Sequence, residues 1–144
     1  MKVKIDIDCD ADDVIRRLEG MKLRATNFKP LFWYARLELQ RANAENFGAG
    51  GLPTGSKWEP RTRPYPWPLM IRTGKLMDSL LSLFGPPNNI DNTNAQFGTS
   101  VEYAKFHQYG TTKMPKRKIV FEPRGFARDL AEKAASYVAN ARVP

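Results

Sequence analysis

The sequence predicts an α+β domain: a small antiparallel sheet with a long, broken N-terminal helix and a C-terminal helix packed on it. Three observations predict this class. The first residues alternate apolar and charged side chains, as a strand does; two long stretches space apolar residues three and four apart, as helices do; and a long proline-rich loop lies between them. At 144 residues, the chain is expected to be a single domain, 1–144.

The N-terminus predicts a strand over residues 2–8, with apolar side chains on one face and charged ones on the other. Cys9 follows this strand and is expected to be a small, buried apolar side chain. Asp10 is a good N-cap for the helix that begins next.

A long helix broken at Pro30 is predicted to follow. Apolar residues recur at helical spacing between residues 14 and 42, and the proline divides them into two runs. The residue before a proline is pushed from helical angles, so Lys29 is expected to leave the helix. Either one long helix kinks at this point, or a second helix begins with the proline in its first turn and is capped by Thr26 or Asn27.

This helix is expected to end at Asn46 or Phe47, before a glycine-rich stretch. It carries an aromatic cluster of Phe28, Phe32, Trp33 and Tyr34. Core packing is the favoured interpretation, because these rings are too apolar to be fully solvated. A contact between subunits is the alternative.

Residues 52–68 predict an extended arm, because they contain five prolines. Trp58 and Trp67 stand in this arm, with Arg61 and Arg63 between them. The arm suits either a partner's groove or a position across its own or a neighbouring domain. We expect the protein to associate with itself through this segment.

A short helix and a hairpin are predicted next. Thr73 should cap a helix that includes residues 76–81, and a strand should follow and end near Phe84. Residues 88–94 read as a turn by composition. The alternating segment 95–101 should pair with the strand that ends near Phe84.

The stretch from residue 98 to 117 contains the only histidine. Tyr103 and His107 are spaced as in a short helical turn, which Gly110 should end in a left-handed conformation. A cationic loop follows, and its charged residues are Lys113, Lys116, Arg117 and Lys118. Residues 119–121 predict a short buried strand, and apolar spacing from Phe126 predicts the C-terminal helix.

The formal net charge of +8 is concentrated after residue 47. Residues 1–47 hold 9 basic and 8 acidic side chains, whereas residues 48–144 hold 14 and 7. This bias favours an acidic partner, either nucleic acid or a protein surface. No apolar run approaches the roughly 20 residues of a membrane span, so no membrane contact is expected.

The residues do not predict an enzyme. One cysteine and one histidine provide neither a disulfide nor the ligands of a zinc site, and no phosphate-binding loop is present, so no cofactor is expected. His107 would need a nucleophile such as Ser79, Ser82 or Ser100, but no G-x-S-x-G motif surrounds these serines. We instead expect His107 to satisfy a hydrogen bond within its own helical turn.

Five short motifs follow one another from residue 53 onward. They read Pro53-Thr-Gly55 with Trp58-Glu-Pro60, Thr73-Gly-Lys-Leu76 with Ser79, Gly98-Thr, Tyr103-Ala104 with His107-Gln-Tyr-Gly110, and Met114-Pro-Lys-Arg117. In this order they resemble the phage virion morphogenesis family, the tail-completion and head–tail joining proteins of tailed bacteriophages and prophages. The resemblance covers residues 53–123.

The resemblance implies a non-enzymatic structural protein that joins or completes the tail at the neck of the virion, as a ring, after assembly in the cytoplasm of the bacterial host. Its partners would be copies of itself and neighbouring neck or tail proteins, with non-specific contact to DNA. Partner-contact candidates are Trp58, Arg61, Arg63, Trp67 and the four cations of the loop. Structural motif positions are Gly74, Leu76, Tyr103, His107, Gly110 and Pro115.

The alternative is a small basic nucleic-acid-binding protein that uses the cationic segment 113–128. Its contacts would be Lys113, Lys116, Arg117, Lys118, Arg124 and Arg128. Phosphate contacts of this kind would make binding fall steeply with salt.

Overall fold

The computed structural model describes residues 11–82, 84–85 and 87–141. The elements are α1 (Ala11–Ala25), α2 (Lys29–Gly48), the 3-10 turn η1 (Leu52–Thr54), α3 (Lys75–Leu81), β1 (Asn89–Ile90), β2 (Ala95–Gln96), α4 (Ala104–Tyr109) and α5 (Phe126–Asn140). Helices and a small antiparallel sheet confirm the predicted α+β class. The strand and cap predicted for residues 2–10 lie outside the described residues. No described helix is long and apolar enough to cross a membrane.

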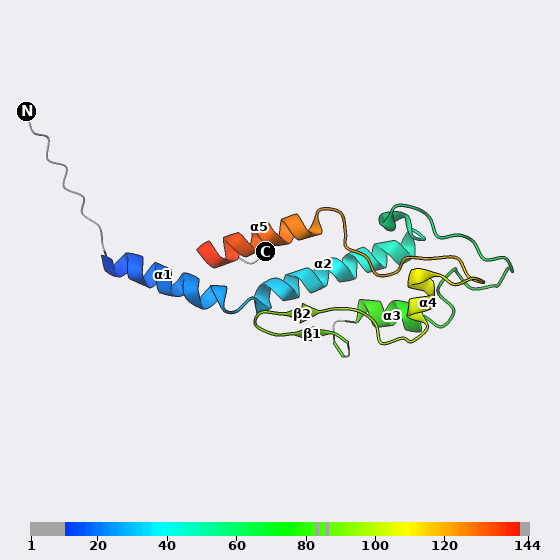
Figure 1. Cartoon of the computed structure of the whole chain (residues 1–144), viewed down its shortest axis with the longest axis horizontal. Helices are drawn as coiled ribbons and strands as arrows, with labels where there is room; N and C mark the ends of the chain where they lie inside the picture. The colour runs from blue at the N-terminus through cyan, green and yellow to red at the C-terminus, as the bar shows by residue number, and fades with distance from the viewer. Residues whose placement is uncertain (1–10, 83, 86, 142–144) are drawn as a thin grey trace, which may run out of the picture.

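Helix α2 runs through the middle of the molecule, with α5 on one side and α3 and the β1–β2 hairpin on the other (Figure 1). The main buried cluster consists of Phe47, Trp58, Leu76, Leu80, Val101, Ala104 and Ile119. The helices therefore pack around α2 and not on a face of the sheet. Two residues per strand offer too little surface to cover a helix.

The predicted break at Pro30 is confirmed, since α1 and α2 are separate helices and the proline lies in the first turn of α2. Lys29 is nevertheless helical, contrary to the prediction. Its N–H donates to Oδ1 of Asn27 at 3.2 Å, and this hydrogen bond holds it in the first turn. Thr26 does not cap α2, because its hydroxyl donates back to Leu23 O.

The aromatic cluster at the start of α2 is divided between two environments. The ring of Phe28 lies 6.4 Å from that of Tyr137 in α5, and the Tyr34 hydroxyl donates to Asp129 of α5 at 2.9 Å. Trp33 faces outward and is 40% exposed. Part of the cluster therefore joins α2 to α5, as the core interpretation predicted, and one ring remains on the surface.

The hairpin differs from the prediction. Its strands pair Asn89 with Gln96 and Ile90 with Ala95, so β1 lies within the segment predicted as a turn and β2 begins the segment predicted as a strand. The partner of residues 95–101 is therefore not a strand ending near Phe84. The ladder stops early because side chains bind the next backbone donors: Gly98 N donates to Asn88 Oδ1, and Val101 N donates to Thr99 Oγ1.

Residues 119–121 do not form the predicted strand, because Gln108 replaces a neighbouring strand. The backbone N–H groups of Ile119 and Val120 both donate to Oε1 of Gln108 at 2.9 Å, and its Nε2 donates to Val120 O at 2.8 Å. Ile119 is fully buried, so its N–H has no access to water. One amide side chain thus holds this segment against α4.

Replacing Gln108 with alanine is expected to lower the free energy of unfolding by about 1–3 kcal/mol, because it leaves a buried N–H without an acceptor. Urea denaturation measures this change. Gln96→Ala, at an exposed position of β2, is the matched control and should change stability by less than about 0.5 kcal/mol. Equal losses for the two variants would contradict the structural role of Gln108.

Two predicted helix ends also need correction. Thr73 does not cap α3, which instead follows Gly74 at φ 76° without a side-chain cap. Gly110 ends α4 with a positive φ of 76°, as expected, but its ψ of 175° is extended and not left-handed helical. A Cβ at Gly110 would lie 3.0 Å from Lys116 N and 3.2 Å from Met114 O, so the close approach of the two backbones requires glycine.

Candidate functional site

Two long loops meet at the end of the molecule remote from α1 (Figure 1). One is the arm of residues 52–68, and the other is the cationic loop after α4. With the start of α3 they line an open groove of about 860 Å³. Rings and cations face this groove, and the principal ones are Arg61, Tyr65, Trp67, Arg72, His107 and Arg117.

Four side chains form a ladder along one wall of the groove. The rings of Tyr65 and Trp67 stack with centroids 4.8 Å apart and an interplanar angle of 17°. The Arg61 guanidinium lies 5.6 Å from the first ring, and that of Arg72 lies 5.4 Å from the second. This alternation of cation, ring, ring and cation offers flat apolar surface together with hydrogen-bond donors for carboxylates. We call it the Arg–aromatic ladder.

Trp58 belongs to the core and not to the groove, which corrects its prediction as an exposed contact. It is 6% exposed, its ring meets Phe47 edge-on at 5.4 Å, and its Nε1 donates to Lys118 O at 3.0 Å. Gly51, at φ 97°, lies so close that a Cβ there would collide with the indole ring. The arm is therefore anchored on its own domain.

Arg117 is also buried, at 5% exposure, so it is not available as a surface cation. Its Nε donates to Glu59 O at 2.9 Å and its Nη2 to Pro60 O at 3.3 Å, which ties the cationic loop to the arm. Burial lowers the pKa of this guanidinium. The remaining predicted cations, Arg63, Lys113, Lys116 and Lys118, are exposed.

His107 does not make the predicted hydrogen bond within its turn. Its Nδ1 is buried and has no hydrogen-bond partner among the described residues. The imidazole instead meets the Tyr103 ring edge-on at 6.1 Å, and its backbone carbonyl accepts a hydrogen bond from Arg117 N at 2.7 Å. Burial, and then the nearby Arg117 charge, lower the pKa of His107 from its usual 6.5.

The lowered pKa of His107 predicts how stability depends on pH. The unfolded chain binds a proton at this side chain near pH 6.5, whereas the folded chain binds it only at lower pH. The free energy of unfolding should therefore fall as pH decreases through 6.5 toward the folded pKa. Thermal melts measure this effect: as the pH is lowered through 6.5, the melting temperature of His107→Phe should fall less than that of the wild type. Equal losses would contradict the burial of the imidazole.

The groove brings together seven of the predicted residues: Arg61, Trp67, Gly74, Leu76, Tyr103, His107 and Arg117. The sequence interpretation missed Tyr65 and Arg72. A signal for the first was present, because residues two apart in an extended segment share one side, and Tyr65 and Trp67 have this spacing. Arg72 has no comparable signal in the sequence.

Ser79, one of the three serines considered as partners for His107, takes part in other contacts. Ser79 Oγ is 2.6 Å from Thr99 Oγ1 and donates to Leu76 O, so its hydroxyl takes part in packing α3 against the chain after β2. Among the residues that the structure describes, no three His, Cys, Asp or Glu side chains gather to hold a metal ion.

Residues 9–139 match the phage virion morphogenesis family, and the chain belongs to this family. Over 124 residues it is 29% identical to the Mu-like prophage FluMu G protein 2 of Haemophilus influenzae. The matched residues make up 86% of this chain and 82% of that protein. No solved structure matches the chain. The motif-based prediction of the family is confirmed, and the chain has a role in building a phage particle.

Proposed function

We propose that this protein is a non-catalytic structural component of the virion that joins or completes the tail at the head–tail interface. It is assembled in the cytoplasm of the host, as a ring of identical single-domain subunits. The observation that carries this proposal is the Arg–aromatic ladder. Its stacked rings and flanking guanidinium groups are typical of protein interfaces, where aromatic residues and arginine are enriched.

The ladder suits an acidic surface of a neighbouring neck or tail protein. Arg61 and Arg72 provide donors on both sides of the stacked rings, and Tyr65 is 52% exposed. The exposed Lys113 and Lys116 of the cationic loop add positive charge. Complementary charge steers such partners together and fixes their register.

Deleting the gene from its phage or prophage tests the proposal. We expect full heads and tails to accumulate separately, or tails to remain incomplete, in negative-stain electron micrographs of the lysate. The wild-type gene supplied from a plasmid should restore joined particles. Intact, infectious virions in the absence of the gene would contradict the proposal.

The nucleic-acid alternative predicts a different result in solution. Arg117 is buried, so one of the six cations named for the nucleic-acid interpretation is not available to phosphates. We therefore expect only weak binding of duplex DNA near physiological salt, with a dissociation constant of about 10⁻⁵ M or weaker. Fluorescence anisotropy across a salt series measures this. Tight binding with a salt slope that indicates six or more phosphate contacts would favour the alternative.

A further inference from the structure

Helix α2 buries a positive charge that no described group neutralises. Arg36 is 1% exposed, and its Nε and Nη2 have no hydrogen-bond partner among the described residues. Its guanidinium lies 5.5 Å from the centre of the Phe97 ring, a contact that satisfies none of the N–H donors. Although burial lowers the pKa of Arg36, a guanidinium remains charged at neutral pH. A buried charge without a partner is strongly destabilising, so an acceptor is expected from elsewhere.

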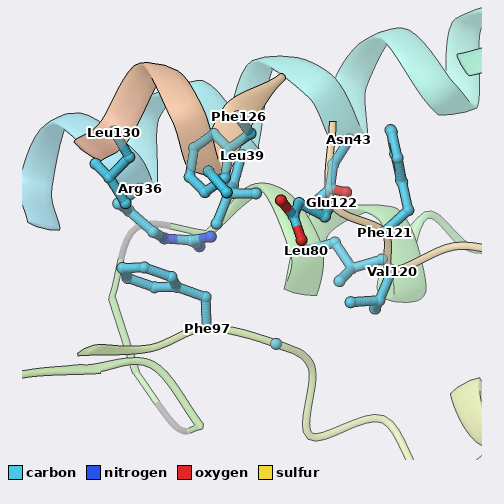
Figure 2. A pocket seen from close by; sticks show the side chains of 12 residues that line it. Arg36, Leu39, Asn43, Leu80, Phe97, Val120, Phe121, Glu122, Phe126 and Leu130 are labelled. Carbon is cyan, nitrogen blue, oxygen red and sulfur yellow. The ribbon is translucent and has the colours of Figure 1, made fainter. Parts of the chain in front are cut away.

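Figure 2 shows a cavity beside this guanidinium. The cavity has a volume of about 360 Å³. It lies between α2, the first turns of α5 and the segment that precedes α5, and its apolar walls include Leu39, Leu80, Phe126 and Leu130. Glu122 at the cavity makes no hydrogen bond or ion pair with a described residue. The cavity therefore suits an apolar occupant that also carries a carboxylate for Arg36 and a cation for Glu122.

Helix α1 offers such a face. Ile15, Leu18 and Glu19 are spaced three and four apart, so they share one side of the helix, and Lys22 follows on that side one turn later. Ile15 is 51% exposed and Leu18 is 58% exposed. Glu19 has no partner among the described residues. The first turns of α1 extend beyond the end of α5 (Figure 1), where another molecule can reach them.

The cavity and the α1 face are not in contact within one chain. Arg24 Nε donates to Val138 O at 2.8 Å, which ties the end of α1 to the last turn of α5. Phe126 and Leu130, which line the cavity, lie in the opposite half of α5. An α1 face that fills the cavity must therefore belong to a second copy of the chain.

We propose that α1 of one copy docks into the cavity of the next copy, with Ile15 and Leu18 between the apolar walls and the Glu19 carboxylate bound to the Arg36 guanidinium. Lys22 then faces Glu122. Because the two surfaces differ, the contact is heterologous, and contacts of this type form a ring when the rotation between neighbouring subunits closes. The inference rests on the proposed function, since it names the contact between subunits of the ring.

Sedimentation velocity of the full chain tests this contact with one variant on each surface. Leu18→Glu places a charge on the α1 face, and Ala127→Trp fills the cavity from an exposed position of its wall. Each should weaken self-association by about thirtyfold or more, the effect of losing one interface hot spot. Leu37→Glu changes a leucine that is 50% exposed outside both surfaces, and it should leave association unchanged. Melting temperatures confirm that each variant folds.

Mixing the two variants tests the heterologous geometry. Leu18→Glu retains an intact cavity, and Ala127→Trp retains an intact α1 face. Their equimolar mixture should form a 1:1 dimer and nothing larger, although each alone remains monomeric. If only larger species or only monomers form in the mixture, the proposed geometry is wrong.

Two further variants separate the sources of the carboxylate. Glu19→Gln should weaken self-association, and it should leave the melting temperature unchanged at concentrations where the wild type is monomeric. If Glu122→Gln instead lowers the melting temperature and Glu19→Gln has no effect on association, Arg36 is neutralised within its own chain and the inference is overturned. If the Leu18→Glu variant associates as strongly as the wild type, only this inference is overturned. A wild type that stays monomeric at all concentrations also overturns the proposed ring.

Discussion

Replacing Trp58 with alanine is expected to lower the free energy of unfolding by about 3–5 kcal/mol, the usual cost of removing a buried aromatic side chain. The indole fills the space between Phe47 and Gly51 and donates its N–H to Lys118 O. Its removal therefore loosens both the arm and the end of the cationic loop at Lys118. The melting temperature should fall by more than about 10 °C.

Trp33→Ala provides the matched control, because this tryptophan is 40% exposed and contacts mainly Phe84, with ring centroids 6.0 Å apart. This variant should lose less than about 1.5 kcal/mol of the free energy of unfolding. Guanidinium denaturation of both variants measures the difference. Similar losses would show that Trp58 does not hold the arm, and the arm would then be free to reach a neighbour.

The double variant Tyr65→Ala with Trp67→Ala is expected to fold normally and to fail in assembly. These rings lie in the groove wall and outside the buried core cluster. Interface aromatic residues contribute about 2 kcal/mol each, so the loss of both, about 4 kcal/mol, should weaken the contact by roughly several hundredfold. Plaque titre in a complementation assay should fall accordingly, with unjoined heads and tails in electron micrographs.

Tyr109→Ala is the control for the ladder, since this tyrosine is 77% exposed and lies outside the groove. It should complement as well as the wild type. Deleting residues 52–68 would not be a clean test, because the deletion removes Trp58 from the core. Full complementation by the double variant would contradict the role of the ladder.

The helices follow from the sequence more directly than the strands. Apolar spacing predicted α5, and Pro30 predicted the separation of α1 from α2, because both signals act within a few residues. The strands depend on which group accepts each backbone N–H. At residues 119–120 that group is the side chain of Gln108, which the pattern of apolar residues does not reveal.

The groove could be predicted only in part, because burial separates residues that look alike in the sequence. Trp58 and Trp67 both stand in the proline-rich arm, yet only Trp58 enters the core. Arg117 lies between two exposed lysines and is buried against backbone carbonyls of the arm. Arg36 left a signal that was missed: it follows Phe32 by four residues and precedes Leu39 by three, which places it on a helix face with apolar neighbours.

We propose that this protein is a structural part of the virion. Mass spectrometry of gradient-purified virions, together with a cryo-electron microscopy reconstruction of the neck, tests it most directly. We expect a fixed number of copies per particle and a ring of density at the head–tail junction into which α2, α5 and the hairpin fit. Absence of the protein from purified virions, while it is abundant in the lysate, would contradict a structural role in the particle.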